Sequence, residues 1–207
     1  MTDERPSRER LVTASLELMR RNGYAGTGIK AVLTASAVPY GSLYHHFPGG
    51  KEELGAETLR AGGLVYLALV EAFFPPGADV VEATAAFFEG AAEFVASTDF
   101  VDACPIATIA GEIAGTSEPM RLAAADAFES WMAVLRERLT GAGIAAARSA
   151  ELAVELFCGL EGAFLLSRTI RSVEPILVTG RAATAAVAAE LGALALDIET
   201  VRAQQGV

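Results

Sequence analysis

The segment AVPYGSLYHHFPGGKEEL, from Ala37 to Leu54, concentrates the side chains that could do chemistry. It holds two tyrosine hydroxyls, a serine, a lysine and two adjacent imidazoles, which are the only histidines of the chain. Such groups can ligate a metal, cradle a phosphate, transfer protons or contact DNA. The spacing of the residues decides among these chemistries.

Metal binding and catalysis do not fit the spacing. Adjacent helical residues point about 100° apart, so His45 and His46 cannot both bind one ion, and no third ligand is suitably spaced. A phosphate-cradling loop would need Ser or Thr in place of Glu52 and glycine in place of His45. Motifs of the types G-x-S-x-G and H-E-x-x-H are absent from the sequence. We therefore expect no metal, no cofactor and no enzyme.

DNA contact agrees with where these residues would lie on a helix. Proline is tolerated in the first turn of a helix, so the pattern predicts a short helix at about 39–46, ended by Pro48-Gly49-Gly50. Small and hydrogen-bonding residues stand at its N-terminal end, where a recognition helix approaches base edges: Tyr40, Gly41 and Ser42. Tyr44 follows Tyr40 by one turn, so its hydroxyl can reach a phosphate.

Other elements must position this helix. A first helix is predicted from Ser7 to Asn22 and a second at about 28–35, with Thr27 placed to cap it. Thr27 and Lys51 each stand at a helix N-terminus, where the helix dipole favours a phosphate. Two short helices joined by a tight turn and braced by a first helix make a helix-turn-helix module.

The rest of the chain predicts helices only. Alanine is abundant and alternating Val, Ile and Thr runs are nearly absent, so we expect an all-α fold. A long helix should run from Lys51 to Pro75-Pro76. Further helices are predicted at about 79–97, 101–114, 118–140, 148–171 and 174–201. The last two are so apolar that they need partners on all faces, which predicts a two-fold interface between two copies of the chain.

Charge divides the chain into two parts. The formal net charge is −10, yet residues 1–51 carry seven basic and four acidic side chains, leaving +3 there and −13 in the remainder. Because a polyanion needs local positive charge, only the N-terminal part is expected to touch nucleic acid. The predicted domains are a DNA-binding domain at 1–50 and a larger helical domain for ligand binding and dimerisation at 51–207.

Location in the cell follows from the N-terminus and the cysteines. The chain opens with charged residues where a secretory signal would be apolar, and no stretch approaches the ~18–20 apolar residues of a membrane span. Cys104 and Cys158 are too few for a disulfide framework, and both are expected to be buried thiols. We expect a cytoplasmic protein without a membrane segment.

A ligand cavity is a possibility in the acidic part. Aromatic and polar residues that could line one are Phe87, Phe88, Phe94, Cys104, Glu112, Trp131, Phe157, Glu161 and Phe164. For any single aromatic residue, core packing remains the default explanation. Glu161 interrupts the most apolar helix and is costly to bury unpaired, so it should find a partner.

The sequence resembles a known family at these same residues. G-Y-x-G-T-x-I followed by A-V-P-x-G-S-L-Y-H-H-F-P-G-G-K-E-E-L is similar to the N-terminal domain of the TetR family of transcriptional regulators. PGGKEEL and CPIATIAGE resemble its lincomycin-resistance-repressor branch. The resemblance implies a homodimer that binds a palindromic double-stranded DNA operator and leaves it when a small molecule enters the C-terminal domain.

The resemblance also implies roles for individual residues. Four match phosphate-contacting positions: Thr27, Tyr44, His46 and Lys51. Four match positions of the reading helix: Tyr40, Gly41, Ser42 and His45. Two residues depart from the pattern, because Gly28 stands where a second threonine is usual and Tyr40 where lysine is frequent.

The prediction is therefore a ligand-responsive transcriptional repressor. One alternative is a small-molecule-binding helical protein with a non-functional DNA module, which the departures at Gly28 and Tyr40 allow. Another is an all-α enzyme that uses the same cavity, and it would require perturbed carboxylates such as Glu112 and Glu161 to converge on one cleft.

Overall fold

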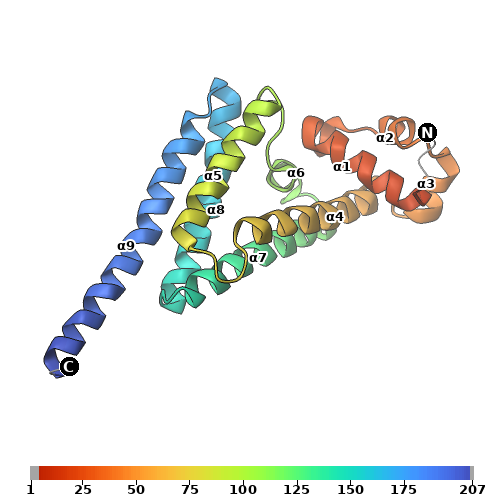
Figure 1. Cartoon of the computed structure of the whole chain (residues 1–207). Coiled ribbons are helices and arrows are strands. Elements are labelled where there is room, and N and C mark those ends of the chain that lie inside the picture. Colours follow the sequence, from red (N-terminus) through yellow and green to blue (C-terminus); the bar gives the residue numbers. More distant parts are fainter. Residues whose placement is uncertain (1–4, 206–207) are drawn as a thin grey trace. The chain divides into compact units, whose positions relative to one another are not determined.

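The computed structural model describes residues 5–205, with side-chain surroundings for residues 5–193, and this part of the chain is helical without a strand (Figure 1). The all-α prediction is confirmed. The helices are α1 (Ser7–Gly26), α2 (Ile29–Ser36), α3 (Tyr40–His46), α4 (Gly50–Phe73), α5 (Val80–Ser97), α6 (Pro105–Ile113), α7 (Glu118–Gly141), α8 (Ala146–Ile170) and α9 (Glu174–Gln205).

The chain forms two compact units. The first runs to Leu67 and resumes over Val101–Glu129, so it contains α1 to α3, most of α4, α6 and the first half of α7. The second comprises Ala68–Phe100 and the chain from Ser130 onward. The functional division at residues 50 and 51 stays a prediction.

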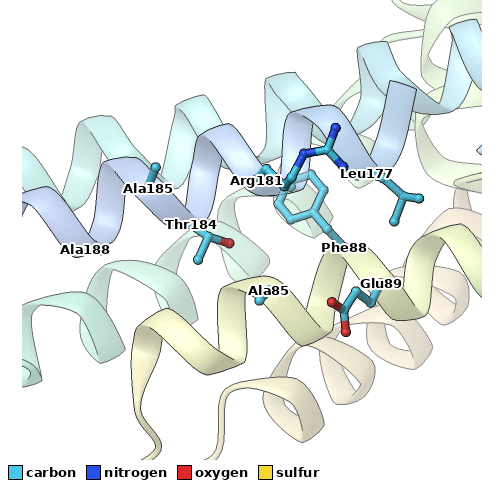
Figure 2. A pocket seen from close by; sticks show the side chains of 9 residues that line it. Ala85, Phe88, Glu89, Leu177, Arg181, Thr184, Ala185 and Ala188 are labelled. Atoms are coloured by element: carbon cyan, nitrogen blue, oxygen red, sulfur yellow. The ribbon is translucent and has the colours of Figure 1, made fainter. Parts of the chain in front are cut away.

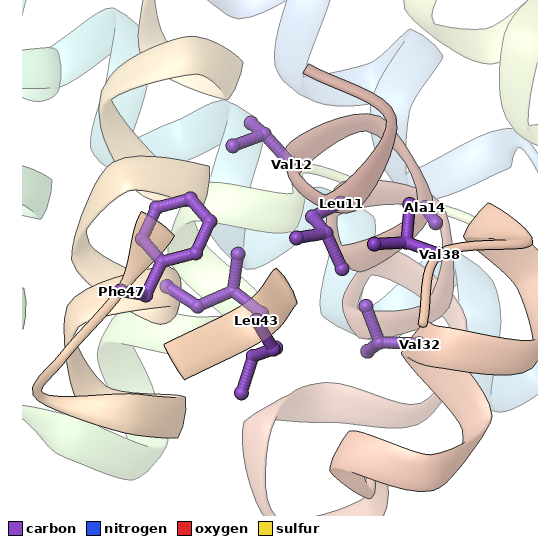
Figure 3. Packing of buried hydrophobic residues seen from close by; sticks show 8 residues of the cluster. Leu11, Val12, Ala14, Val32, Val38, Leu43 and Phe47 are labelled. Carbon is purple, nitrogen blue, oxygen red and sulfur yellow. The ribbon is translucent and has the colours of Figure 1, made fainter. Parts of the chain in front are cut away.

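A small apolar core holds α1, α2 and α3 together in the first unit. Figure 3 shows its members, which come from these three helices, the turns beside α3 and the start of α4: Leu11, Val12, Ala14, Val32, Val38, Leu43, Phe47 and Leu54. Leu18, Ile29 and Leu33 are partly buried against it. Packing of this kind fixes α3 although seven residues are too few for a stable helix alone.

The turn between α2 and α3 is set by one left-handed residue. Ala37 has φ 51° and ψ 38°, and the amide of Val38 donates to the carbonyl oxygen of Leu33 at 3.3 Å. This is the six-to-one hydrogen bond that closes a helix C-terminus. The turn directs Val38 into the core and lets Pro39 precede α3.

Aromatic residues and small residues hold the second unit together. Helix α9 packs against both α5 and α8. Close approach depends on glycines: a β-carbon at Gly90 would lie 2.6 Å from the ring of Phe73, and one at Gly180 would lie 2.5 Å from Phe88. The aromatic residues meet edge to face, as when the centroids of Phe74 and Phe87 lie 5.7 Å apart.

Four local expectations are wrong. Thr27 does not cap α2, whose N-cap is Gly28. Helix α6 begins at Pro105 and not near 101, because Asp99 and Phe100 have positive φ and Pro105 favours a helix start. Cys158 is exposed rather than buried. A stretch of membrane-spanning length was not expected, but Glu174–Ala193 within α9 is long and apolar enough by length and composition, with a mean hydropathy of 1.3.

Candidate nucleic-acid interface

Helix α3 has one anchored face and one exposed face. Leu43 and Phe47 are almost completely buried in the core of the first unit. The exposed surface beside this face carries Tyr40 and Tyr44, which are 66% and 42% exposed. Large aromatic side chains held at the surface by a buried helix face are typical of a binding surface, because burying them in a partner is favourable.

The two tyrosines of α3 support each other. Their ring centroids are 5.5 Å apart, and their hydroxyl oxygens are 3.5 Å apart. This contact raises the pKa of Tyr44 above 10.0, through the side-chain hydrogen bond with Tyr40 first and its charge second. Tyr44 therefore stays an uncharged phenol at neutral pH, which suits a hydroxyl that must approach a phosphate.

The remaining polar residues of α3 lie beside this pair. Gly41 and His45 are exposed, whereas Ser42 and His46 are half-buried. A β-carbon at Gly41 would meet no atom within 4 Å, so the backbone is open to an approaching partner. The imidazole centroids are 5.1 Å apart. Among the described residues no group of three His, Cys, Asp or Glu side chains is arranged to hold a metal ion.

Lys51 lies in the first turn of α4 and is oriented by an aromatic ring. Its Nζ stands 4.2 Å from the ring centroid of Tyr24, a cation–π contact. Burial lowers the pKa of Lys51 below 10.5, while the Glu112 carboxylate acts in the opposite direction. The turn before it is shaped by Gly50, whose φ is 68° and whose β-carbon position lies 3.5 Å from the ring of Tyr44.

Thr27 faces inward. Its side chain is 1% exposed, and its hydroxyl donates to the carbonyl oxygen of Gly23 at 2.8 Å. A direct phosphate contact through this hydroxyl would require the side chain to turn outward. The role that the resemblance implies for Thr27 therefore receives no support from its position, and it stays a prediction.

Glu112 ties α6 to the end of α1. Its two carboxylate oxygens accept hydrogen bonds from the backbone amides of Tyr24 at 3.0 Å and Ala25 at 2.7 Å. Gly23 makes room for this carboxylate, because a β-carbon there would collide with Oε1 of Glu112. Its φ of 71° and ψ of 178° also fall in a region that only glycine adopts readily. Glu112 thus holds protein backbone in this structure, and its expected role as a ligand anchor stays a prediction.

Two further polar contacts fix neighbouring parts of the first unit. Arg20 forms an ion pair with Asp102 at 3.0 Å, and the Asp102 side chain is only 5% exposed. The hydroxyl of Ser117 donates to the Glu52 carboxylate at 2.6 Å. The partners are 82 and 65 residues apart in the sequence, so residue spacing alone gives no signal for these contacts.

The predicted ligand residues divide between the two units. Cys104 and Glu112 belong to the first unit, whereas Phe94, Trp131, Phe157 and Glu161 belong to the second. Trp131 and Phe157 do meet, with ring centroids 5.8 Å apart, and both are buried. Phe94 on α5 and Glu161 on α8 are half-buried.

A groove of about 420 Å³ lies between α5 and α9 in the second unit (Figure 2). Its walls include Phe88, Leu177 and Thr184, with Glu89 and Arg181 as the charged residues. Of the residues expected to line a cavity, Phe88 lies in its wall. Trp131 and Phe157 serve as core in this structure, and the ligand roles expected for these residues stay predictions.

Helix α8 and the described part of α9 expose apolar side chains. Leu165, Leu166 and Ile170 of α8 are 68%, 56% and 60% exposed, and Val178 of α9 is 48% exposed. Exposed apolar residues that repeat at helical spacing indicate an interaction surface.

The anchored α3, the tight turn before it and the α1 brace define the chain as a helix-turn-helix transcriptional regulator. Residues 11–58 match the family of bacterial regulatory proteins called tetR, and residues 80–182 match the C-terminal domain of LmrA/YxaF-like transcriptional regulators. The chain belongs to the TetR family, with a C-terminal domain of the LmrA/YxaF-like type. Members of this family regulate transcription and are not enzymes.

Two relatives from Bacillus subtilis (strain 168) cover most of the chain. The HTH-type transcriptional regulator YxaF is 33% identical over 178 residues, which are 86% of this chain and 93% of the relative. The HTH-type transcriptional regulator LmrA is 32% identical over 171 residues, 83% of this chain and 91% of the relative.

Solved structures share the fold. A regulatory protein TetR from Rhodobacter sphaeroides aligns with a TM-score of 0.76 and 24% identity, covering 87% of this chain and 98% of that one. A TetR transcriptional regulator from Legionella pneumophila aligns with a TM-score of 0.77 and 20% identity, covering 88% and 97%.

Proposed function

We propose that this TetR-family protein is a ligand-responsive repressor that binds a palindromic operator as a homodimer in the cytoplasm. The observation that carries the proposal is the exposed pair Tyr40 and Tyr44 on a helix whose other face is buried. Two side chains beside the pair supply donors, His45 on α3 and Lys51 on α4. The +3 charge of residues 1–51 against −13 elsewhere directs this end of the chain to DNA.

Each contact has a proposed role. The phenol of Tyr44, the imidazole of His46 and the ammonium of Lys51 donate to phosphates and set the register of α3 on the duplex. The N-terminal residues of α3, together with His45, face base edges in the major groove. Thr27 contributes through the turn that it stabilises with Gly23.

Helices α8 and α9 form the proposed dimer interface. Leu165, Leu166 and Ile170 would pack against a second copy, and only 17% of the most apolar window of Glu174–Ala193 is buried within one chain. A four-helix arrangement would cover that surface without a membrane. Two α3 helices must then lie about 34–36 Å apart, so that they enter successive major grooves.

An apolar effector would act by shifting the equilibrium between two conformations of the dimer. A small molecule that binds better to a form with another α3 separation draws the dimer away from DNA, and ~1–3 kcal/mol of coupling changes operator affinity by roughly 5- to 150-fold. The groove between α5 and α9, with Phe88 and Leu177 as apolar walls, is one candidate location.

The decisive experiment is selection of bound duplexes from a random pool with the purified full-length chain. We expect an inverted repeat whose half-site centres are about one helical turn apart, with affinity that falls as salt rises. A small-molecule-binding protein with a non-functional DNA module would enrich no sequence. An enriched site without two-fold symmetry would contradict the homodimer.

The effector is tested separately on the selected duplex. Apolar and monocationic compounds are added to the complex, and release of labelled DNA is measured by fluorescence anisotropy. A compound that releases DNA should also raise the thermal midpoint of the free protein, because it binds the folded state. Thermal stabilisation without DNA release would contradict the inducer role.

A further inference from the structure

The recognition surface lacks the side chains that usually read guanine, adenine and cytosine. From residue 31 to residue 50 the sequence is AVLTASAVPYGSLYHHFPGG, which contains no Arg, Lys, Asn, Gln, Asp or Glu. In the major groove, Arg or Lys pairs with guanine, Asn or Gln with adenine, and Asp or Glu accepts from cytosine. Helix α3 offers none of these pairings.

Helix α3 can still recognise one base directly, which is thymine, through its methyl group. The thymine C5-methyl group projects into the major groove and is recognised by apolar contact. Tyr40, the first residue of α3, exposes 66% of its surface, the largest fraction among the aromatic side chains of the exposed α3 face. Hydroxyls and imidazoles on the same helix add hydrogen bonds, but only an aromatic ring offers a broad apolar contact.

The Tyr40 ring is supported on one side and open on another. Tyr44 lies against it at 5.5 Å between ring centroids with an interplanar angle of 54°. Tyr44 in turn lies beside Gly50, at 3.5 Å from its β-carbon position. Gly41 follows Tyr40, and a β-carbon added at Gly41 would meet no atom within 4 Å. A ring held in this way loses little conformational entropy when a base approaches.

We propose that Tyr40 reads the C5-methyl group of one thymine in each operator half-site. This inference rests on the proposed operator binding and specifies its chemistry: the ring selects T over C at that position through a methyl contact. Lysine, which is frequent at the matching position of the family, would select guanine instead.

Uracil substitution tests the methyl contact directly. In the selected operator, each thymine is replaced by uracil at symmetric positions, which removes only the methyl group. We expect one symmetric pair at which affinity falls about fourfold per half-site and about fifteenfold per dimer, the effect of one methyl-sized apolar group at each site. Uracil at other positions serves as the control.

Two variants of Tyr40 assign the effect to its ring. Tyr40→Phe keeps the ring and should keep the thymine-to-uracil ratio, whereas Tyr40→Ala should bring that ratio to about one. Because the side chain is exposed, neither variant should disturb the fold, which circular dichroism can verify. Tyr44→Phe should weaken binding to thymine and uracil duplexes equally.

The results of these experiments distinguish a failure of the methyl readout from a failure of operator binding. If wild-type protein binds the selected operator but tolerates uracil everywhere, or if Tyr40→Ala keeps the full ratio, the methyl readout is wrong and operator binding stands. If no duplex is enriched, operator binding is overturned and the methyl readout with it.

Discussion

The contacts that stabilise the first unit internally differ from those that stabilise the second. In the first, polar contacts join residues far apart in the sequence: Glu112 with the amides of Tyr24 and Ala25, and Arg20 with Asp102. In the second, aromatic rings and glycines make close buried contacts, Nε of Arg138 donates to the carbonyl oxygen of Phe74 at 2.9 Å, and ion pairs such as Arg171 with Asp99 lie at the surface.

This difference indicates how each unit responds to change. Hydrogen bonds and ion pairs depend on direction, so those around the end of α1 fix its orientation with little contribution from area burial. Apolar packing depends on volume, so the second unit should respond to cavities and to charges placed on its apolar surface. We expect mutations in the first unit to change operator binding and mutations in the second to change stability and assembly.

The largest effect is expected on the exposed apolar surface of α8. Leu165→Glu places a charge at a position that is 68% exposed in one chain but buried in the proposed dimer. Since each uncompensated buried charge costs several kcal/mol and the two-fold axis doubles it, the dimer should dissociate. Analytical ultracentrifugation measures the change.

Leu64→Glu on α4 is the matched control, because Leu64 is also 68% exposed but lies outside α8 and α9. It should leave the sedimentation coefficient unchanged. A dimer that survives Leu165→Glu would place the interface elsewhere.

A cavity in the aromatic core of the second unit is expected next. Trp131 is 2% exposed and lies against Phe157. Trp131→Ala should lower the free energy of unfolding by about 3–5 kcal/mol, measured by urea denaturation. Leu122→Ala, at a residue 46% exposed in the first unit, should change it by less than about 0.5 kcal/mol. Equal losses would contradict the role of Trp131 as a core residue.

In the first unit, Gly23→Ala should break the contact between α6 and α1. The new β-carbon would displace the Glu112 carboxylate, and alanine is strained at φ 71° and ψ 178°. We expect a loss of about 1–3 kcal/mol in unfolding free energy and weaker operator binding.

Gly28→Ala is its control, since a β-carbon there meets no atom within 4 Å and φ is −82°. It should be nearly neutral in stability. Adding Glu112→Ala to Gly23→Ala should cost little more, because both changes remove the same hydrogen bonds. Additive losses would show that Gly23 and Glu112 act separately.

The sequence predicts elements better than their connections. Helix periodicity and the Pro48-Gly49-Gly50 stop placed α3 within one residue of its observed bounds, since these are local signals. The first helix was predicted to end at Asn22, and its regular part ends there, before the non-helical Gly23. Thr27 was misplaced because the residue that precedes α2 directly, Gly28, takes the N-cap position.

Contacts between residues far apart in the sequence could not be predicted from the sequence. The pairing of Glu112 with backbone near Gly23 spans almost ninety residues and depends on how α6 packs against α1. The aromatic residues of the acidic part illustrate the same limit, because Trp131 has helical spacing whether it lines a cavity or fills a core. Only tertiary packing distinguishes the two cases.

A smaller effect is expected from a single phosphate contact. Lys51→Ala should weaken binding to specific and nonspecific duplexes alike, and it should lower the slope of log K against log salt by about 1 for each protomer. Titrations at several salt concentrations measure this slope. Arg121→Ala removes an exposed cation from α7 and should leave the slope unchanged. An unchanged slope in Lys51→Ala would remove Lys51 from the DNA contacts.

The smallest effect is the pH dependence of the same contact. Burial lowers the pKa of Lys51 below 10.5, so its ammonium releases the proton at a lower pH than a fully hydrated lysine does. Because the phosphate contact needs the charged form, operator affinity should fall as pH rises toward this lowered pKa. The decline should be a few-fold as pH is raised from neutral toward 10.5, since one phosphate contact is involved.

Lys51→Arg separates Lys51 from the other groups that titrate in this range. Arginine remains charged throughout, so the variant should lose less affinity than the wild type over the same interval. The other groups of the interface are present in both proteins, so their contributions cancel in the ratio of the two affinities. Parallel curves for the two proteins would mean that the charge of Lys51 does not contribute to operator binding.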